Sequence, residues 1–107
     1  MKLENSILIC SYLDLYGSLL SKNQFEVCDA YFYADQTLSE IAENFSISRQ
    51  AVLDTIKKCS KKLECYENKL QLFKKKSALN RLLDSFKNDK VSLNDFILEI
   101  TKFEEEF

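Results

Sequence analysis

The sequence predicts an all-α fold, and three observations support this prediction. The 107 residues include no proline and a single glycine, which excludes turn-rich β architectures. Apolar residues recur three and four positions apart over most of the chain, which is the spacing of one face of a helix. Capping-box pairs stand where such segments begin, Ser21 with Gln24 and Thr37 with Glu40. We therefore expect six helices in one domain over residues 1–107.

The composition excludes most classes of enzyme. The chain contains no histidine, so it lacks the usual base of a catalytic triad and the imidazole ligand of metal sites. One glycine cannot build the loops that cradle phosphates or dinucleotides. The cysteines form no C-x-x-C pair and stand among apolar neighbours, as reduced core thiols do; they are Cys10, Cys28, Cys59 and Cys65. We expect no catalytic residue, no metal, no disulfide and no cofactor.

The chain shows no segment that would direct it to or through a membrane. It has no run of eighteen apolar residues, and its first residues lack the charged and apolar blocks of a signal peptide. We expect a cytoplasmic protein without membrane insertion.

Charge is distributed unevenly along the chain. The net charge of −2 divides into −5 over residues 1–48, +6 over residues 49–76 and −3 over residues 77–107. A basic middle segment between acidic ends suits a polyanionic partner, and a solvated lysine-rich helix face has the same composition. Charge alone favours neither interpretation.

The first predicted helix, from about Asn5 to Leu20, carries two neighbouring apolar stripes. One consists of Ile9, Leu13, Tyr16 and Leu20, and the other of Leu8, Tyr12, Leu15 and Leu19. So wide a face suits a helix that packs against its own domain and a second subunit, or a deeply buried helix. A second helix follows Ser21 and runs to about Tyr33, burying Phe25, Cys28 and Phe32.

A short helix, a three-residue turn and a long helix follow, over about residues 37–66. Residues 38–45 form the short helix, and residues 46–48 interrupt its periodicity with Ile47 as the apolar plug of the turn. Ser48 stands as the N-cap of the next helix. This is the order of a helix-turn-helix, and an ordinary αα-hairpin shares it.

The helix that begins at Arg49 keeps a seven-residue apolar pattern. Its seam consists of Val52, Ile56, Cys59, Leu63, Tyr66, Leu70 and Phe73. The pattern predicts a long central helix of about 25 residues, or about 37 Å. A seam of this length needs a long partner, which is the first helix, the C-terminal part of the chain or a second copy.

A C-terminal helical hairpin completes the predicted bundle. Its first helix begins at Ser77, residues 88–91 form the loop, and Ser92 with Asp95 caps the last helix. Residues 104–107 form a frayed end. The inward residues are Ala78, Leu79, Leu82, Leu83, Phe86, Leu93, Phe96, Ile97, Ile100 and Phe103.

The candidate nucleic-acid-binding residues surround the predicted turn and follow the long helix. They are Thr37, Ser48, Arg49, Gln50, Lys57, Lys58, Lys61 and Lys62. Arginine suits guanine edges and glutamine suits adenine edges, while capped amides and lysines suit phosphates. Simple capping and solubility explain the serine, the threonine and the lysines equally well. Asp54 would repel phosphate unless it pairs with Arg49 or Lys58 or accepts from cytosine, and an outward Leu53 suits a protein partner better than DNA.

At these residues the sequence resembles the YlxM family of small bacterial helix-turn-helix proteins, whose genes lie beside those of the signal recognition particle and its receptor. The resemblance covers about residues 8–73. Its most specific part is the run Ser48-Arg49-Gln50-Ala51-Val52 followed by Asp54; it also includes Asp14-Leu15-Tyr16, Tyr31-Phe32, Leu38-Ser39-Glu40-Ile41-Ala42-Glu43, and Leu63-Glu64 with Tyr66-Glu67. Over the helix-turn-helix alone the sequence is similar to sigma-factor region 4.

The resemblance implies a sigma region 4-like helical protein that binds DNA, has a regulatory role and acts in the signal recognition particle pathway. The departures are Asn23, where lysine is usual, Thr37, where serine is common, and Ser46, where related turns often have glycine. A left-handed serine at that position costs about 1 kcal/mol.

Two functions are therefore expected from the sequence. The first is a nucleic-acid-binding regulator of DNA or signal recognition particle RNA. The alternative is an accessory factor that binds the signal recognition particle GTPases and modulates GTP turnover. We expect a homodimer in either case, because helix-turn-helix proteins commonly read two half-sites.

Overall fold

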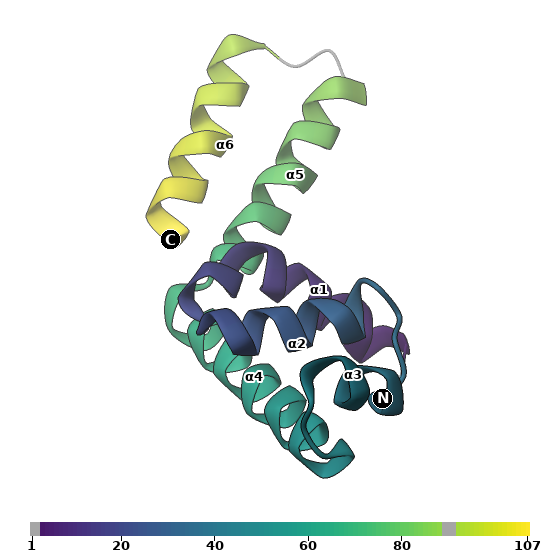
Figure 1. The fold of residues 1–107 in the computed structure, drawn as a ribbon. Coiled ribbons are helices and arrows are strands. Elements are labelled where there is room, and N and C mark those ends of the chain that lie inside the picture. Colours follow the sequence, from purple (N-terminus) through teal and green to yellow (C-terminus); the bar gives the residue numbers. More distant parts are fainter. Residues whose placement is uncertain (1–2, 89–91) are drawn as a thin grey trace. The chain divides into compact units, whose positions relative to one another are not determined.

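The computed structural model describes residues 3–88 and 92–107, and every regular element in this part of the chain is a helix (Figure 1). Its elements are α1 (Leu3–Tyr16), the 3-10 helix η1 (Gly17–Leu19), α2 (Lys22–Phe32), α3 (Leu38–Phe45), α4 (Arg49–Leu70), α5 (Leu72–Asn88) and α6 (Leu93–Glu106). The predicted all-α class is confirmed. The chain forms two compact units, Met1–Leu70 and Gln71–Phe107. The single domain over residues 1–107 stays a prediction, because a compact unit need not fold alone.

In the unit Met1–Leu70, α4 is the central helix, and α1, α2 and α3 all pack against it. One core cluster lies between α1, α2 and the C-terminal half of α4; its buried residues are Ile9, Leu13, Tyr16, Leu20, Cys28, Cys59 and Leu63. A second lies between α2, α3 and the N-terminal half of α4; its buried residues are Val27, Ile41, Val52 and Ile56. Helices of the same chain therefore cover the predicted seam of α4 from Val52 to Leu63.

A buried hydrogen bond closes the C-terminal end of this core. The Tyr16 hydroxyl donates to Oε1 of Glu67 at 2.6 Å, and both side chains are buried. A carboxylate can remain in such a place because it is hydrogen-bonded. Apolar spacing does not reveal this residue, since the predicted seam passed through its neighbour Tyr66, which is partly buried against the same cluster.

The turn between α3 and α4 has the predicted length. Ser46 adopts the left-handed conformation, with φ 55° and ψ 42°, and its N–H donates to the carbonyl oxygens of Ala42 and Glu43. The next amide, of Ile47, also donates to Ala42 at 3.1 Å. These bonds satisfy the last carbonyls of α3 and reverse the chain. The expected apolar plug is wrong, because Ile47 is exposed.

The first two helices differ from the prediction where α1 meets α2. The predicted first helix to Leu20 ends at Tyr16 and continues as η1, because the chain turns there against Phe25. A Cβ added to Gly17 would lie 2.8 Å from the Phe25 ring, so the only glycine of the sequence permits this close approach. Phe25 packs on Gly17 and is itself exposed, so its predicted burial is wrong. In α2, Val27 is buried instead.

The predicted helix through Phe73 is also interrupted. α4 ends at Leu70, Gln71 takes a left-handed conformation with φ 57°, and α5 begins at Leu72 instead of Ser77. The apolar spacing continues across the break because Phe73 belongs to the apolar side of the next helix. No glycine or proline marks this site, so the sequence pattern did not reveal it.

In the unit Gln71–Phe107, α5 and α6 form the expected hairpin, with Ser92 accepting a hydrogen bond from the Asp95 amide as N-cap. The rings of Phe86 and Phe96 lie 5.0 Å apart. Three details differ from the prediction. Leu83, Leu93, Phe96 and Ile97 are exposed, Asn88 belongs to α5, and α6 continues to Glu106 instead of fraying from residue 104. The rest of the predicted loop, residues 89–91, lies outside the described residues.

Replacing Ser46 by glycine should stabilise the protein, because glycine adopts the left-handed conformation without the steric cost of a Cβ. We expect Ser46→Gly to raise the free energy of unfolding by about 0.5–1 kcal/mol in urea denaturation. Ser39→Gly, at an exposed position inside α3, is the matched control and should lower it by a similar amount. Equal destabilisation by both substitutions would contradict the turn geometry.

Candidate nucleic-acid interface

The N-terminal turn of α4 presents two of the predicted base-contacting residues to solvent. Arg49 and Gln50 are both exposed, and the Ser48 hydroxyl caps the helix by accepting a hydrogen bond from the Ala51 amide at 3.0 Å. Nε2 of Gln50 donates to Oδ1 of Asp54, one helical turn later, at 3.0 Å. Asp54 is thus paired, but with Gln50 rather than with Arg49 or Lys58 as considered from the sequence.

A hollow of about 390 Å³ lies beside this turn. It is lined by Leu38 of α3 and by Arg49, Gln50 and Leu53 of α4. Leu53 is half-buried, so the outward leucine expected from the sequence is partly covered. The hollow therefore combines a guanidinium and a carboxamide with apolar walls.

The four predicted lysines of α4 are all exposed, and within the described part of Met1–Leu70 none of them forms an ion pair with a carboxylate. Lys62 alone is held in place, since its Nζ donates to Oε1 of Gln24 at 3.3 Å. The same oxygen accepts from the Ser21 amide in the capping box of α2. The other three are Lys57, Lys58 and Lys61, whose ammonium groups stand free among the described residues of this unit.

These lysines border two further hollows, both of which are lined by Lys61. One has a volume of about 360 Å³ and is lined by Gln24, Lys58, Lys61, Lys62 and Cys65. The other, of about 640 Å³, is lined by Tyr31, Leu53, Ile56, Lys57, Ser60, Lys61 and Glu64. In the second, the Ser60 hydroxyl is buried and has no hydrogen-bond partner among the described residues. The apolar spacing of the sequence did not predict that this serine would be buried.

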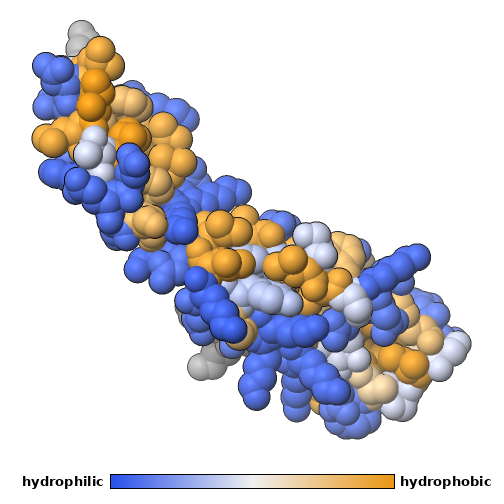
Figure 2. All heavy atoms as spheres, turned by 90° about the vertical axis from the view of Figure 1, so that its left-hand side faces the viewer, coloured by the Kyte–Doolittle hydropathy of each residue, from blue (hydrophilic) through white to orange (hydrophobic). Residues whose placement is uncertain are grey.

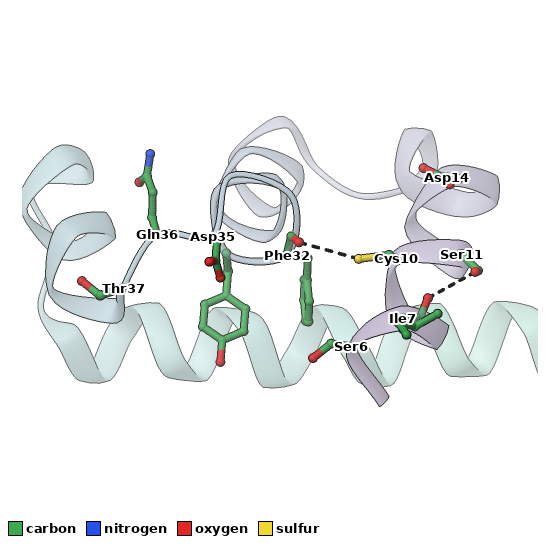
Figure 3. Close-up of a pocket in the computed structure, with 10 residues that line it drawn as sticks. Ser6, Ile7, Cys10, Ser11, Asp14, Phe32, Asp35, Gln36 and Thr37 are labelled. Atoms are coloured by element: carbon green, nitrogen blue, oxygen red, sulfur yellow. Dashed lines mark hydrogen bonds between the residues drawn. The ribbon is translucent and has the colours of Figure 1, made fainter. Parts of the chain in front are cut away.

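Thr37 lines none of the hollows that the other candidate residues border. Its hydroxyl accepts from the Glu40 amide at 3.1 Å as the N-cap of α3. It lines the end of a separate hollow of about 790 Å³ between α1 and the connection that follows α2, shown in Figure 3. In that view Cys10 reaches from α1 towards Phe32, whose carbonyl oxygen accepts from its thiol at 3.7 Å.

Tyr31 and Tyr33, at the C-terminal end of α2, have different surroundings, and of these two only Tyr31 lines a hollow together with the lysines. Tyr33 is engaged elsewhere, because the single proton of its hydroxyl is shared between two acceptors, the Asp14 carboxylate and the carbonyl oxygen of Cys10. Burial, together with the hydrogen bond to Asp14, raises the pKa of Tyr33 above its usual value.

The cysteines fit the core interpretation except for one. Cys28 and Cys59 are fully buried, and Cys10 is half-buried. The hydrogen bond with the Cys59 thiol, followed by burial, raises the pKa of Cys28, which keeps that thiol protonated. Cys65 is exposed on α4, so its predicted core position is wrong.

The described residues provide neither a metal-binding cluster nor a membrane span. Among residues 3–88 and 92–107, no group of three histidine, cysteine, aspartate or glutamate side chains is placed to hold a metal ion. None of the helices in the same ranges combines the length and the apolar character that a membrane span requires.

Comparison with known proteins places the chain in a family. The family described as "UPF0122: Putative helix-turn-helix protein, YlxM / p13 like" matches residues 3–103. The UPF0122 protein YofM of Lactococcus lactis is 39% identical over 105 residues, which cover 98% of this chain and 92% of that protein. A UPF0122 protein of Clostridium kluyveri is 41% identical over 95 residues, 82% and 86% of the two chains.

A UPF0122 protein of Clostridium perfringens is more similar over a shorter stretch. It is 48% identical over 73 residues, which are 68% of this chain, and the match spans 65% of the length of that relative. The family match over residues 3–103 and the turn that joins α3 to α4 both indicate a helix-turn-helix. The chain belongs to the UPF0122 family of YlxM/p13-like helix-turn-helix proteins.

Proposed function

We propose that this protein is a nucleic-acid-binding regulator, in which Arg49 and Gln50 of α4 contact base edges and the lysines of α4 contact phosphates. The observation that carries the proposal is that the four lysines are exposed and without ion pairs in the described part of their unit, on the helix that follows the turn. A helix in this position of a helix-turn-helix enters the major groove with its N-terminal residues.

The spacing along α4 separates the two kinds of contact. Gln50, Lys57 and Lys61 lie seven and four residues apart on the side of the helix opposite the buried seam. At about 1.5 Å per residue, the two lysines lie about 10 and 16 Å beyond Gln50. The major groove is about 12 Å wide, so a helix with its first turn among the bases carries these ammonium groups to the sugar-phosphate backbone.

The hydrogen bond from Gln50 to Asp54 is compatible with base contact. A carboxamide nitrogen has two protons, and Asp54 accepts only one of them. The second proton and the carbonyl oxygen remain for the N7 and N6 positions of adenine. Asp54 thus fixes the orientation of the amide, while its charge weakens the attraction of nearby phosphates.

The lysine contacts predict a salt dependence. If four phosphates are neutralised, the logarithm of the binding constant should fall with the logarithm of the salt concentration with a slope of about −3.6, because each contact contributes about −0.9 to the slope. Replacing Lys57 and Lys61 together by alanine should reduce the slope by about 1.8. Fluorescence anisotropy with a mixed-sequence DNA duplex and with an RNA hairpin measures both values. Lys22→Ala on α2, an exposed lysine that pairs with Glu26, is the control and should leave the slope unchanged. Absence of binding to both probes at low salt would refute the proposal.

The base contacts predict a separate effect on specificity. Once a preferred duplex has been selected, Arg49→Ala and Gln50→Ala should each lower its advantage over a mixed-sequence duplex by about 1–3 kcal/mol. Non-specific affinity should change much less after Gln50→Ala, since that substitution removes no charge. Competition binding measures this advantage. If the preference for the selected duplex is unchanged by both substitutions, residues other than Arg49 and Gln50 recognise the bases.

A second candidate function is that of an accessory factor that binds the signal recognition particle GTPases, the alternative expected from the sequence. The hollow between α3 and α4 favours it, because Leu38 and Leu53 give apolar walls around Arg49, which suits an acidic and apolar protein segment. This role predicts that added protein changes GTP turnover and that Leu53→Asp abolishes the change. Unchanged turnover in the presence of the intact protein would exclude this candidate and leave the first unaffected.

A further inference from the structure

The C-terminal hairpin lacks a core of its own. Among the described residues of Gln71–Phe107, no side chain of α5 or α6 is fully buried. The two helices touch through half-buried residues and the ring pair of Phe86 and Phe96. Two short helices that bury so little apolar surface do not hold each other in water. Another surface must therefore cover the hairpin.

Three of the exposed apolar residues of the hairpin, Leu83, Leu93 and Ile97, lie on one of its faces. Leu83 stands three residues before Phe86 in α5, and Leu93 stands three residues before Phe96 in α6. An antiparallel pair has an approximate two-fold axis perpendicular to its plane, so equivalent positions on the two helices face the same side. The exposed fractions are 39% for Leu83, 73% for Leu93 and 53% for Ile97, which follows Leu93 by one turn. Figure 2 shows apolar side chains at the surface of this hairpin.

The charges of the two helices indicate which surface covers this face. α5 carries five basic residues and one acidic residue, whereas α6 carries five acidic residues and one basic residue. When two such hairpins meet face to face about a two-fold axis parallel to the helices, each α5 lies over the α6 of the other copy. Every basic helix then has two acidic neighbours, and the like-charged helices occupy the diagonals.

We propose that the protein dimerises through this face and forms an antiparallel four-helix bundle from the α5–α6 hairpins of two copies. The bundle buries Leu83, Leu93 and Ile97 of each copy against the same residues and their neighbours in the other. This assembly does not depend on nucleic acid, so it is independent of the proposed function. It differs from the subunit contact predicted for the first helix, because the dimer forms through the opposite end of the sequence.

Two adjacent residues of α6 give a matched test. Ile97 and Leu98 are 53% and 54% exposed, but about 100° of helix rotation separates their side chains, so that only Ile97 lies on the proposed face. In sedimentation equilibrium without nucleic acid, the chain of 107 residues should have twice its 12.5 kDa mass at micromolar concentrations. Ile97→Asp should raise the dissociation constant by about a hundredfold or more, because it buries an unpaired charge. Leu98→Asp should change it by less than about threefold.

A third variant and a second measurement complete the test. Leu19→Asp places a charge on the exposed apolar side of the first helical segment, which consists of α1 and η1, and it should leave the dimer intact. The melting temperature of the unaltered chain should rise with protein concentration, and that of Ile97→Asp should not. A monomeric unaltered chain, a dimeric Ile97→Asp variant, or equal dissociation by Ile97→Asp and Leu98→Asp would each overturn the proposal. Dissociation caused only by Leu19→Asp would assign the interface to the first helical segment instead.

Discussion

Burial of one face of α4 is the constraint on which the unit Met1–Leu70 depends. Val52, Ile56, Cys59 and Leu63 are buried, and three other helices reach them from the same side. Because the helix has about 3.6 residues per turn, fixing these four positions also fixes which residues point away from the core. The exposure of Gln50, Lys57 and Lys61 is thus a consequence of packing, and it needs no contact of their own to be maintained.

Three residues within 3–88 and 92–107 adopt the left-handed conformation, and each stands where the chain changes direction after a helix. Asp35, Ser46 and Gln71 have φ values between 54° and 57°, and they follow α2, α3 and α4 respectively. None of them is glycine, so each carries a steric cost that the surrounding contacts must offset. At Ser46 the offset is visible in the amide bonds to α3 and in the capping of α4 by Ser48. These bonds connect the two helices of the motif rigidly enough to hold Arg49 and Gln50 beside Leu38.

The two proposals assign different tasks to the two compact units. The unit Met1–Leu70 encloses its own core and presents a cationic helix face, which suits a polyanionic ligand. The unit Gln71–Phe107 has opposite charges on its two helices and an uncovered apolar face, which suits a second copy. If both hold, dimerisation brings two helix-turn-helix motifs into one assembly, and the affinity for paired sites then depends on protein concentration as well as on salt.

The sequence alone determined the helical class, the helix-turn-helix order and the buried seam up to Leu63, because helix caps and apolar spacing are local properties of the chain. It also placed Arg49, Gln50 and the lysines outside the core, since their positions follow from the same periodicity. Only the tertiary structure decided that α1, α2 and α3 cover α4, that Glu67 is buried beside Tyr16, and that the long helix stops at Leu70. Those features depend on residues that are distant in sequence, or on a backbone conformation that glutamine adopts without any compositional signal.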